Sequence, residues 1–182
     1  ALQEVTEPLV LLLFTHSFLR RYYFTSIDHI PTDTMCPSGT MLLSIWPLCE
    51  PKFDALPSNN GRGFVNASVC WTSPSGSQVR LRVGTMHLES PPKAWDLRAE
   101  QAKSIGELCR QHMFIVGGDV NVKEDPNPLA LGIGETDVWL SARRGESGYT
   151  RGPRIVPVNV PESWDRDYRQ DRIYVSQSLK VE

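Results

Sequence analysis

The sequence lacks the markers of several large protein classes. No apolar run approaches the ~20 residues that a membrane-spanning helix needs, since the run from Leu9 to Phe14 is far too short. Neither the P-loop pattern G-x-x-x-x-G-K-[ST] nor the dinucleotide pattern G-x-G-x-x-G is present. A G-x-S-x-G nucleophile elbow is missing too, because the segment 145–149 ends in Tyr149 where the pattern needs glycine. These absences argue against a membrane span, the common nucleotide-binding classes and a serine hydrolase.

Zinc-binding patterns and an excess of basic charge are also absent. The cysteines are 13, 21 and 39 residues apart, with no C-x-x-C pair: Cys36, Cys49, Cys70 and Cys109. Zinc is therefore disfavoured, and a disulfide framework is unusual in a domain of this size, so we expect reduced, partly buried thiols. The 19 Lys and Arg against 21 Asp and Glu give a net charge of −2. That balance argues against a general nucleic-acid-coating protein, but not against an enzyme that holds one phosphodiester through a metal ion.

The composition that is present is that of an ordinary globular domain. With 182 residues, 40% of them hydrophobic, and no internal repeat, we expect a single domain over residues 1–182. Periodicity and turn residues predict helices over 7–20, 94–112 and 127–132, strands over 41–45, 63–71, 78–86, 113–117 and 170–176, and a strand or loop over 21–24. Loops are expected over 28–39, from 46 to about 62 and over 143–163. Hairpins mixed with strand–helix–strand units predict packed sheets flanked by helices.

The most informative segment is Gly118-Asp119-Val120-Asn121, which directly follows an apolar, strand-like run. Residues i and i+2 of an extended chain share a face, so Asp119 and Asn121 are expected to point the same way at the lip of a sheet. Asp119 can accept a proton there, and Asn121 can donate hydrogen bonds to a developing oxyanion. The alternative is that both side chains cap a turn or the next helix.

Three further segments carry polar side chains on strand-like stretches. His87 ends the alternating strand 78–86, where it could reach a bound phosphate; alternatively it is a surface or satisfied histidine. Asp171 enters a strand between Arg169 and Arg172, with either of which it could form an ordinary salt bridge. Glu4 lies in an apolar strand fragment, or is simply a surface acid.

Together these segments resemble the endonuclease/exonuclease/phosphatase superfamily of metal-dependent phosphodiesterases. Its members carry, in order, an L-Q-E strand, a T-x-H-L strand, a G-D-x-N strand and an (L/F)-D-(R/Y)-(I/F) strand. This chain has the matching residues at 2–4, 85–88, 118–121 and 170–173. Within the superfamily it is most similar to the 5′-tyrosyl-DNA phosphodiesterase branch, through segments 87–90, 137–139 and 148–150.

The resemblance implies a four-layer α/β/β/α sandwich that lacks the first and last motif-bearing strands. The family's early T-W-N motif and its late S-D-H motif are both absent from this chain. We therefore expect a truncated copy or a fragment of such a domain. A chain without those two motifs is expected to be catalytically poor beside an extended one that carries both.

The resemblance also implies a reaction, namely metal-assisted hydrolysis of a phosphodiester. Glu4 would bind Mg²⁺ or Mn²⁺, and Asp119 would orient and deprotonate the attacking water. Asn121 would hydrogen-bond that water or the phosphate, and His87 would neutralise charge on the transition state. Asp171 would orient the terminal histidine that this chain does not contain.

The implied substrate is the 5′ end of DNA carrying a tyrosyl or peptide adduct. The resemblance also implies that the protein acts in nuclear DNA repair, as a monomer and without binding a membrane. Ser90 and Trp139 are the expected substrate-binding residues, although Trp139 could equally fill the core. Pro91 and Pro92 precede Lys93 where the branch often has a basic residue sooner. Two alternatives stay open: a phosphatase or phosphodiesterase of the same superfamily acting on an inositol phosphate, lipid or nucleotide, and a non-catalytic remnant.

Overall fold

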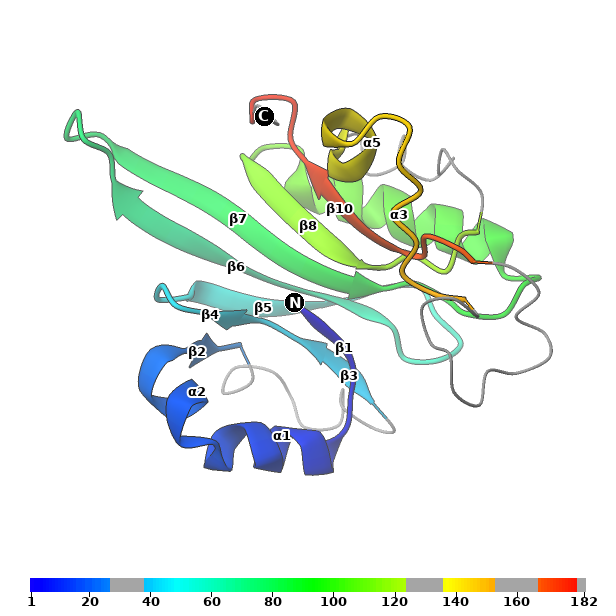
Figure 1. The fold of residues 1–182 in the computed structure, drawn as a ribbon, viewed down its shortest axis with the longest axis horizontal. Coiled ribbons are helices and arrows are strands. Elements are labelled where there is room, and N and C mark those ends of the chain that lie inside the picture. The colour runs from blue at the N-terminus through cyan, green and yellow to red at the C-terminus, as the bar shows by residue number, and fades with distance from the viewer. Residues whose placement is uncertain (27–37, 124–135, 153–166, 180–182) are drawn as a thin grey trace.

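The computed structural model describes residues 1–26, 38–123, 136–152 and 167–179. Its elements are β1 (Leu2–Val5), α1 (Glu7–Thr15), α2 (Ser17–Tyr22), β2 (Phe24–Thr25), β3 (Gly39–Met41), β4 (Leu43–Ser44), β5 (Cys49–Ala55), β6 (Gly63–Thr72), β7 (Gln78–His87), α3 (Trp95–Cys109), β8 (Phe114–Asp119), β9 (Thr136–Asp137), α5 (Val138–Ala142) and β10 (Asp171–Val175). In Figure 1, α1 and α2 cover two small sheets, and α3 covers the far side of a larger one. The layer order is the predicted α/β/β/α sandwich.

The larger sheet brings together the ends of three strands that carry polar residues. Within the described residues its order is β5-β6-β7-β8-β10-β9. Strands β7 and β8 are parallel and are joined through α3, so their carboxyl ends meet at one edge of the sheet. Strand β10 runs antiparallel to β8, so its first residue lies at the same edge. The topology therefore gathers side chains from three distant segments at one place.

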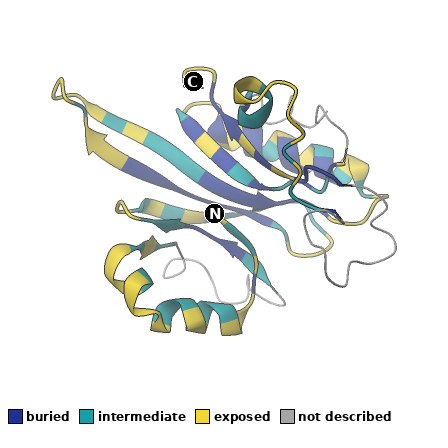
Figure 2. Ribbon diagram, in the orientation of Figure 1, coloured by how far each residue is buried: buried dark blue, intermediate teal, exposed yellow. Residues whose placement is uncertain are grey.

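The main core lies between α3 and this sheet. Ala102, Ile105 and Cys109 form the inward face of α3, at the spacing of an amphipathic helix, and are fully buried. They pack over the strand residues Phe64 and Tyr174. In Figure 2 the buried positions follow the centre of the sheet and the inner face of α3. This core fixes β7 and β8, the two strands whose ends carry the predicted histidine and aspartate.

The N-terminal helix is broken where the sequence predicted one continuous helix over 7–20. His16 is extended (φ −73°, ψ 112°) and separates α1 from α2, which continues to Tyr22. Leu11 and Leu12 are more than 60% exposed, because the run is apolar on every side and no single stripe specifies a straight helix against the small sheets. The strand or loop predicted over 21–24 is therefore helical at its start and reaches the short strand β2 only at Phe24.

The strand predicted over 41–45 is split between two small sheets. Leu42 exchanges two hydrogen bonds with Ser26, from its amide to Ser26 Oγ (3.0 Å) and from the Ser26 amide to its carbonyl (3.1 Å). Strand β3 accordingly pairs with β1, and β4 pairs with β2. The prediction of one strand is wrong because Leu42 bonds a separate segment.

Strand β5 replaces the irregular stretch predicted after residue 45. It contains Pro51, which donates no hydrogen bond, and such a residue is tolerated on an edge strand. A register shift between Cys49 and Lys52 accommodates it. The hairpin, the helix near 94–112 and the strands near 113–117 and 170–176 are confirmed. The predicted helix over 127–132 and most of residues 28–39 and 143–163 lie outside the described residues.

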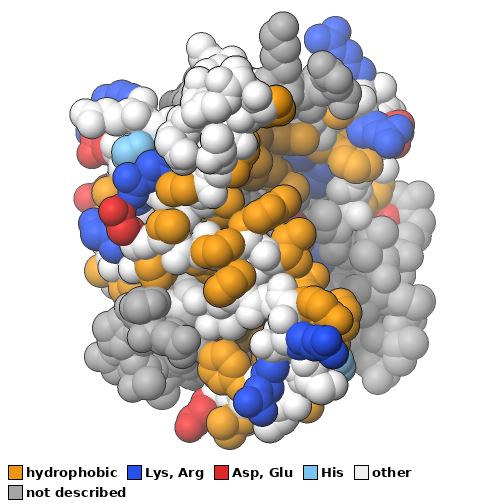
Figure 3. Space-filling view, turned by 90° about the vertical axis from the view of Figure 1, so that its left-hand side faces the viewer, with side chains coloured by type: hydrophobic (Ala, Val, Ile, Leu, Met, Phe, Trp, Pro, Cys, Tyr) orange, Lys and Arg blue, Asp and Glu red, His pale blue; other side chains and the backbone are white. Residues whose placement is uncertain are grey.

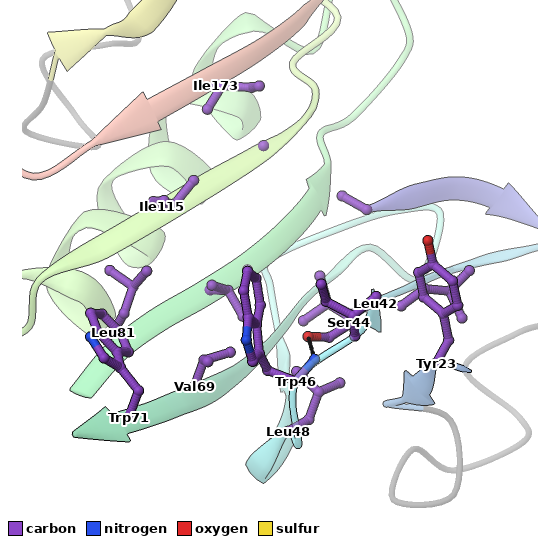
Figure 4. A pocket seen from close by; sticks show the side chains of 16 residues that line it. Tyr23, Leu42, Ser44, Trp46, Leu48, Val69, Trp71, Leu81, Ile115 and Ile173 are labelled. Atoms are coloured by element: carbon purple, nitrogen blue, oxygen red, sulfur yellow. Dashed lines mark hydrogen bonds between the residues drawn. The ribbon is translucent and has the colours of Figure 1, made fainter. Parts of the chain in front are cut away.

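An apolar cleft of about 840 Å³ opens between the small sheets and the six-stranded sheet. Leu42 and Trp46 line one side, and Val69, Leu81 and Ile115 line the other (Figure 4). In Figure 3 hydrophobic side chains gather around the hollow on this face of the molecule. The residues that line the cleft include none of the predicted site residues, so this cleft is not where the predicted chemistry lies. None of the helices described here is both long and apolar enough to cross a bilayer.

Candidate active site

Gly118 allows β7 and β8 to approach closely just before the candidate aspartate. Its φ is +150°, and a Cβ atom there would lie 1.9 Å from the carbonyl oxygen of Met86. Only glycine fits such a contact without moving a strand. The close approach brings His87 into register with Asp119 in the parallel pair.

Asp119 ends β8 and caps the turn that follows it. Its Oδ1 accepts a hydrogen bond from the amide of Asn121 at 2.7 Å, and Asn121 has a left-handed φ of +51°. Asn121 also donates from Nδ2 to the carbonyl oxygen of Leu88 at 2.9 Å. The prediction that Asp119 and Asn121 share a face of an extended strand is therefore wrong, because the chain turns at Asn121. Asn121 instead ties the ends of β7 and β8 together.

His87, Asp119 and Asp171 form a row across three adjacent strands. Asp119 is the register partner of His87 on one side and of Asp171 on the other. His87 Nε2 lies 3.8 Å from Asp119 Oδ2. That separation is too long for a hydrogen bond, but one further oxygen atom could lie within hydrogen-bond reach of both groups. His87 is buried, Asp119 is 19% exposed at its side chain, and Asp171 is exposed.

Glu4 reaches the same region from the opposite small sheet. Gln3 Nε2 donates to Thr85 Oγ1 at 2.6 Å, which docks β1 against β7 two residues before His87. Glu4 has a left-handed φ of +55° and an exposed side chain, and its charge acts on Asp119. Among the described residues three non-glycine residues have a positive φ, and two of them are the predicted site residues Glu4 and Asn121. Such strained backbone is concentrated at functional sites.

The pKa values of Asp119 and His87 are shifted in opposite directions. The pKa of Asp119 is raised to about 6, chiefly by burial; the negative charges of Asp171 and Glu4 add to the rise, and the Asn121 amide and Arg151 oppose it. Burial, with help from Arg62, lowers the pKa of His87 to about 4. At neutral pH the imidazole is therefore uncharged. In that state its protonated nitrogen can donate one hydrogen bond to a phosphate oxygen. The expectation that His87 neutralises charge on a transition state stays a prediction.

The two arginines that flank Asp171 in the sequence both pair with the buried Asp137. Arg169 Nη2 and Arg172 Nη1 lie 2.9 and 3.2 Å from Asp137 Oδ2, and all three side chains are buried. The amide of Asp171 donates to Thr150 Oγ1 at 3.1 Å. Asp171 thus keeps its place at the edge of the sheet, beside Asp119.

Two basic residues near the row were missed by sequence reasoning. Arg62 Nη1 lies 2.9 Å from His87 Nδ1, and Arg151 Nη1 donates to Gln170 Oε1 at 3.0 Å, next to Asp171. Arg151 directly follows the recognised segment 148–150, which is a signal that could have pointed to it. Arg62 lies in a turn before β6 and carries no comparable signal.

The two predicted substrate-binding residues lie in different settings. Ser90 is exposed just beyond β7. Trp139 is half-buried, donates from Nε1 to the carbonyl oxygen of Glu146 at 3.0 Å, and packs so closely on Gly148 that a Cβ atom there would lie 2.4 Å from its ring. Trp139 therefore supports the segment that leads to Thr150, and a role for either residue in substrate binding stays a prediction.

The residues present fit a hard divalent cation held by few protein ligands. In the described parts of the chain, no group of three or more His, Cys, Asp and Glu side chains could hold a metal ion together. Mg²⁺ does not need such a group, because it is commonly bound through one or two carboxylates, several waters and substrate phosphate oxygens. Glu4 offers an exposed carboxylate, and the repulsion among Glu4, Asp119 and Asp171 would fall beside a cation.

The fold is a sandwich of the endonuclease/exonuclease/phosphatase type, and the polar row lies at one edge of its larger sheet. Among solved structures, the chain is similar to truncated TDP2 from Caenorhabditis elegans, with a TM-score of 0.73 and 17% identity over 96% of this chain and 68% of that one. It is also similar to TDP2 from D. rerio complexed with a single-strand DNA product, with a TM-score of 0.70 and 20% identity over 98% of this chain and 71% of that one.

An endonuclease/exonuclease/phosphatase protein from Beutenbergia cavernae DSM 12333 has a TM-score of 0.51 and 18% identity, and the match covers 75% of this chain and 40% of that one. No protein-family model matches the chain, and a search of curated proteins finds no match. The resemblance predicted from the sequence, to the superfamily and to its TDP2-like branch, is confirmed for the fold.

Proposed function

We propose that this protein is a metal-dependent phosphodiesterase whose substrate is a 5′-tyrosyl-DNA linkage, in the repair of nuclear DNA. The observation that carries the proposal is the row of His87, Asp119 and Asp171, in which a half-buried carboxylate has a pKa of about 6 beside a neutral imidazole. A general base works best when its pKa lies near the working pH. The similarity of fold to TDP2 chains, one of them complexed with a single-strand DNA product, supports the choice of substrate.

Asp119 is the proposed acceptor of the proton from the attacking water. Its Oδ1 is occupied by the Asn121 amide, whereas its Oδ2 faces His87. The proton would therefore pass to Oδ2, and His87 would donate to an oxygen of the phosphate on the same side. An acceptor for the water and a donor for the phosphate thus lie 3.8 Å apart, which orients both reactants.

Glu4 is the proposed ligand of Mg²⁺ or Mn²⁺. When bound, the ion would polarise a phosphate oxygen and stabilise the leaving oxyanion. Asp171 and Glu4 raise the basicity of Asp119 through their charge. Ser90, which is exposed three residues after His87, is the proposed contact to the DNA end.

The substrate class is tested by comparing rates on a panel. A single-stranded oligonucleotide with a 5′-phosphotyrosyl end is expected to be hydrolysed in Mg²⁺ faster than an inositol phosphate, a sphingolipid phosphodiester or a nucleotide. Asp96, an exposed acid in the first turn of α3, gives a matched control: Asp96→Asn should leave the rates unchanged. Preferred turnover of the lipid or inositol substrate would replace the proposed substrate with that alternative. No turnover of any of them would favour a non-catalytic remnant.

The activity is expected to fall in acid through the titration of Asp119. The base must be ionised, so kcat/KM should be level above neutral pH and should decline by about tenfold per pH unit below about pH 6. The pKa of His87, about 4, lies below this range, so the histidine should add no second step near pH 6. A pH–rate profile checks this, and an acid limb centred near 4 would contradict it.

A further inference from the structure

The contact between Arg62 and His87 constrains where the imidazole carries its proton. Arg62 Nη1 lies 2.9 Å from His87 Nδ1. A guanidinium has only donors, so Nδ1 must accept, and in the neutral ring the hydrogen is then on Nε2. We propose that Arg62 is a positioning residue that holds His87 as the Nε2–H tautomer, and that the buried carboxylate of Glu89 holds the turn that carries Arg62. The Nε2–H tautomer serves the proposed reaction, so the role of Arg62 in turnover rests on the proposed function.

The tautomer decides what the site can bind. His87 Nε2 faces Asp119 Oδ2 at 3.8 Å. With the hydrogen on Nε2, the site offers one donor beside one acceptor, which suits a phosphate oxygen and a water. With the hydrogen on Nδ1, a nitrogen lone pair would face the carboxylate, and a phosphate oxygen between them would be repelled.

The charged groups on the two sides of His87 have opposite effects: Arg62 favours the neutral imidazole, and Asp119 favours the protonated one. Arg62 faces Nδ1, and a second proton there would set a donor against a donor and a cation against a cation. Asp119 faces Nε2, and Asp171 and Glu4 act on Asp119. Burial is the larger cause that lowers the pKa of His87 to about 4, and Arg62 adds to it.

Glu89 lies two residues after His87 and anchors the turn between β5 and β6. Its fully buried carboxylate accepts hydrogen bonds from Ser58 Oγ at 2.7 Å and from Asn60 Nδ2. Ser58 Oγ in turn accepts from the amides of Asn60 at 3.0 Å and Arg62 at 2.9 Å. The turn is thus folded around one hydroxyl that Glu89 holds. One short segment, 87–89, therefore presents both the histidine and the acid that fixes its arginine.

Helix α3 braces this arrangement from the core side. Gln101 accepts from the amide of Glu89 at 2.9 Å and donates to the carbonyl oxygen of Pro57 at 2.8 Å. Arg98 Nη1 donates to the carbonyl oxygen of Glu89 at 3.0 Å. Glu89, which anchors the turn, and Pro57, which begins it, are therefore both hydrogen-bonded to α3. A carboxylate held in this way can position the turn without touching the substrate.

The tautomer can be measured without any turnover, by heteronuclear NMR of the imidazole nitrogens at neutral pH. The unsubstituted protein is expected to show a protonated Nε2 and an unprotonated Nδ1 for His87. Arg62→Met should leave a mixture of tautomers, with the pKa of His87 moving from about 4 toward its ordinary 6.5. Arg62→Lys should restore part of both effects, because it keeps a charged donor. Arg110→Met, at an exposed position just after α3, is the matched control and should change neither.

Glu89→Gln tests the second half of the proposal. It keeps the size of the side chain and removes its charge, and is expected to give the same mixture of tautomers to a smaller extent. In turnover, Arg62→Met should lower kcat more than it raises KM and should add a second ionisation to the acid limb of the pH profile. A purely structural arginine would not add that ionisation.

Three results would overturn the proposal. The first is an Nδ1–H tautomer or a charged ring for His87 in the unsubstituted protein at neutral pH, which needs no variant to fold. The second is an unchanged tautomer in a folded Arg62→Met protein. The third, an unchanged tautomer in Glu89→Gln, would remove the role of Glu89. None of these depends on activity, so a protein that fails to hydrolyse the proposed substrate but shows the expected spectra would contradict the function and not the positioning.

Discussion

Asp119→Asn is expected to lower kcat by about 10²–10⁴-fold, the usual contribution of a general base. An amide cannot take the proton from water, but its oxygen can still accept the hydrogen bond from the Asn121 amide that Oδ1 accepts now at 2.7 Å. The turn after β8 should therefore keep its shape, and KM should change less than kcat. Initial rates on a 5′-phosphotyrosyl oligonucleotide check this against Asp96→Asn. A variant that keeps more than about a tenth of the rate would remove Asp119 from the chemistry.

The same substitution is expected to stabilise the protein at neutral pH. The pKa of Asp119 rises from 3.8 to about 6 on folding, so the folded state binds the proton more tightly than the unfolded state. The free energy of unfolding should then fall as pH rises from about 4 to about 6, by at most about 3 kcal/mol, and stay level above that. Asp119→Asn carries no such proton and should lose this decline. Denaturant unfolding of both proteins at several pH values checks the sign, and a variant that is less stable at every pH would contradict it.

Asp137→Ala should destabilise the fold more than any other single substitution considered for this chain. Asp137 accepts two hydrogen bonds from Arg169 at 2.9 Å and one from Arg172 at 3.2 Å, all buried. Its Oδ1 also caps α5 by accepting from the amides of Trp139 and Leu140. Removing one partner from a buried ion pair typically costs 3–5 kcal/mol, because the remaining charge stays buried. We expect a loss in that range, of about 3–5 kcal/mol.

The shift in the denaturation midpoint at constant slope measures this loss. Asp137→Asn is the informative companion, since it keeps an oxygen for the helix cap and removes the charge, and should fall between the two proteins. Glu107→Ala, on an exposed face of α3, should change stability by no more than about 0.5 kcal/mol. If Asp137→Ala lowered the free energy of unfolding as little as the control does, the ion pairs of Asp137 with Arg169 and Arg172 would not be what fixes α5 to β10.

The predictions that succeeded depend on local pattern and on the rules of sheet topology. The hairpin of β6 and β7 follows from alternation around the turn at Ser73–Gly76, and α3 from its apolar stripe. The parallel pairing of β7 and β8 then places His87 beside Asp119. Those rules do not predict the turn at Asn121, where a left-handed backbone occurs together with a side-chain hydrogen bond to Leu88, the residue after β7.

The parts that could not be predicted depend on contacts between distant segments. Arg62 meets His87 because a turn is folded around Ser58 and held by Glu89, 31 residues further along the chain. The break at Leu42 likewise depends on Ser26, and no local preference specifies either pairing. The arrangement of the site therefore depends on these hydrogen bonds between distant side chains, which the fold alone does not specify.

The most direct test of the account is the initial rate of tyrosine release from a 5′-phosphotyrosyl single-stranded oligonucleotide, measured with Mg²⁺ and again with a chelator. The account predicts turnover in Mg²⁺, its loss on chelation and its return when Mg²⁺ or Mn²⁺ is added in excess. Asp119→Asn should be about 10²–10⁴-fold slower than the unsubstituted protein in Mg²⁺, and Asp96→Asn should behave like the unsubstituted protein. Turnover that survives the chelator undiminished, or that keeps more than about a tenth of its rate in Asp119→Asn, would contradict the proposal of metal-dependent hydrolysis with Asp119 as the base.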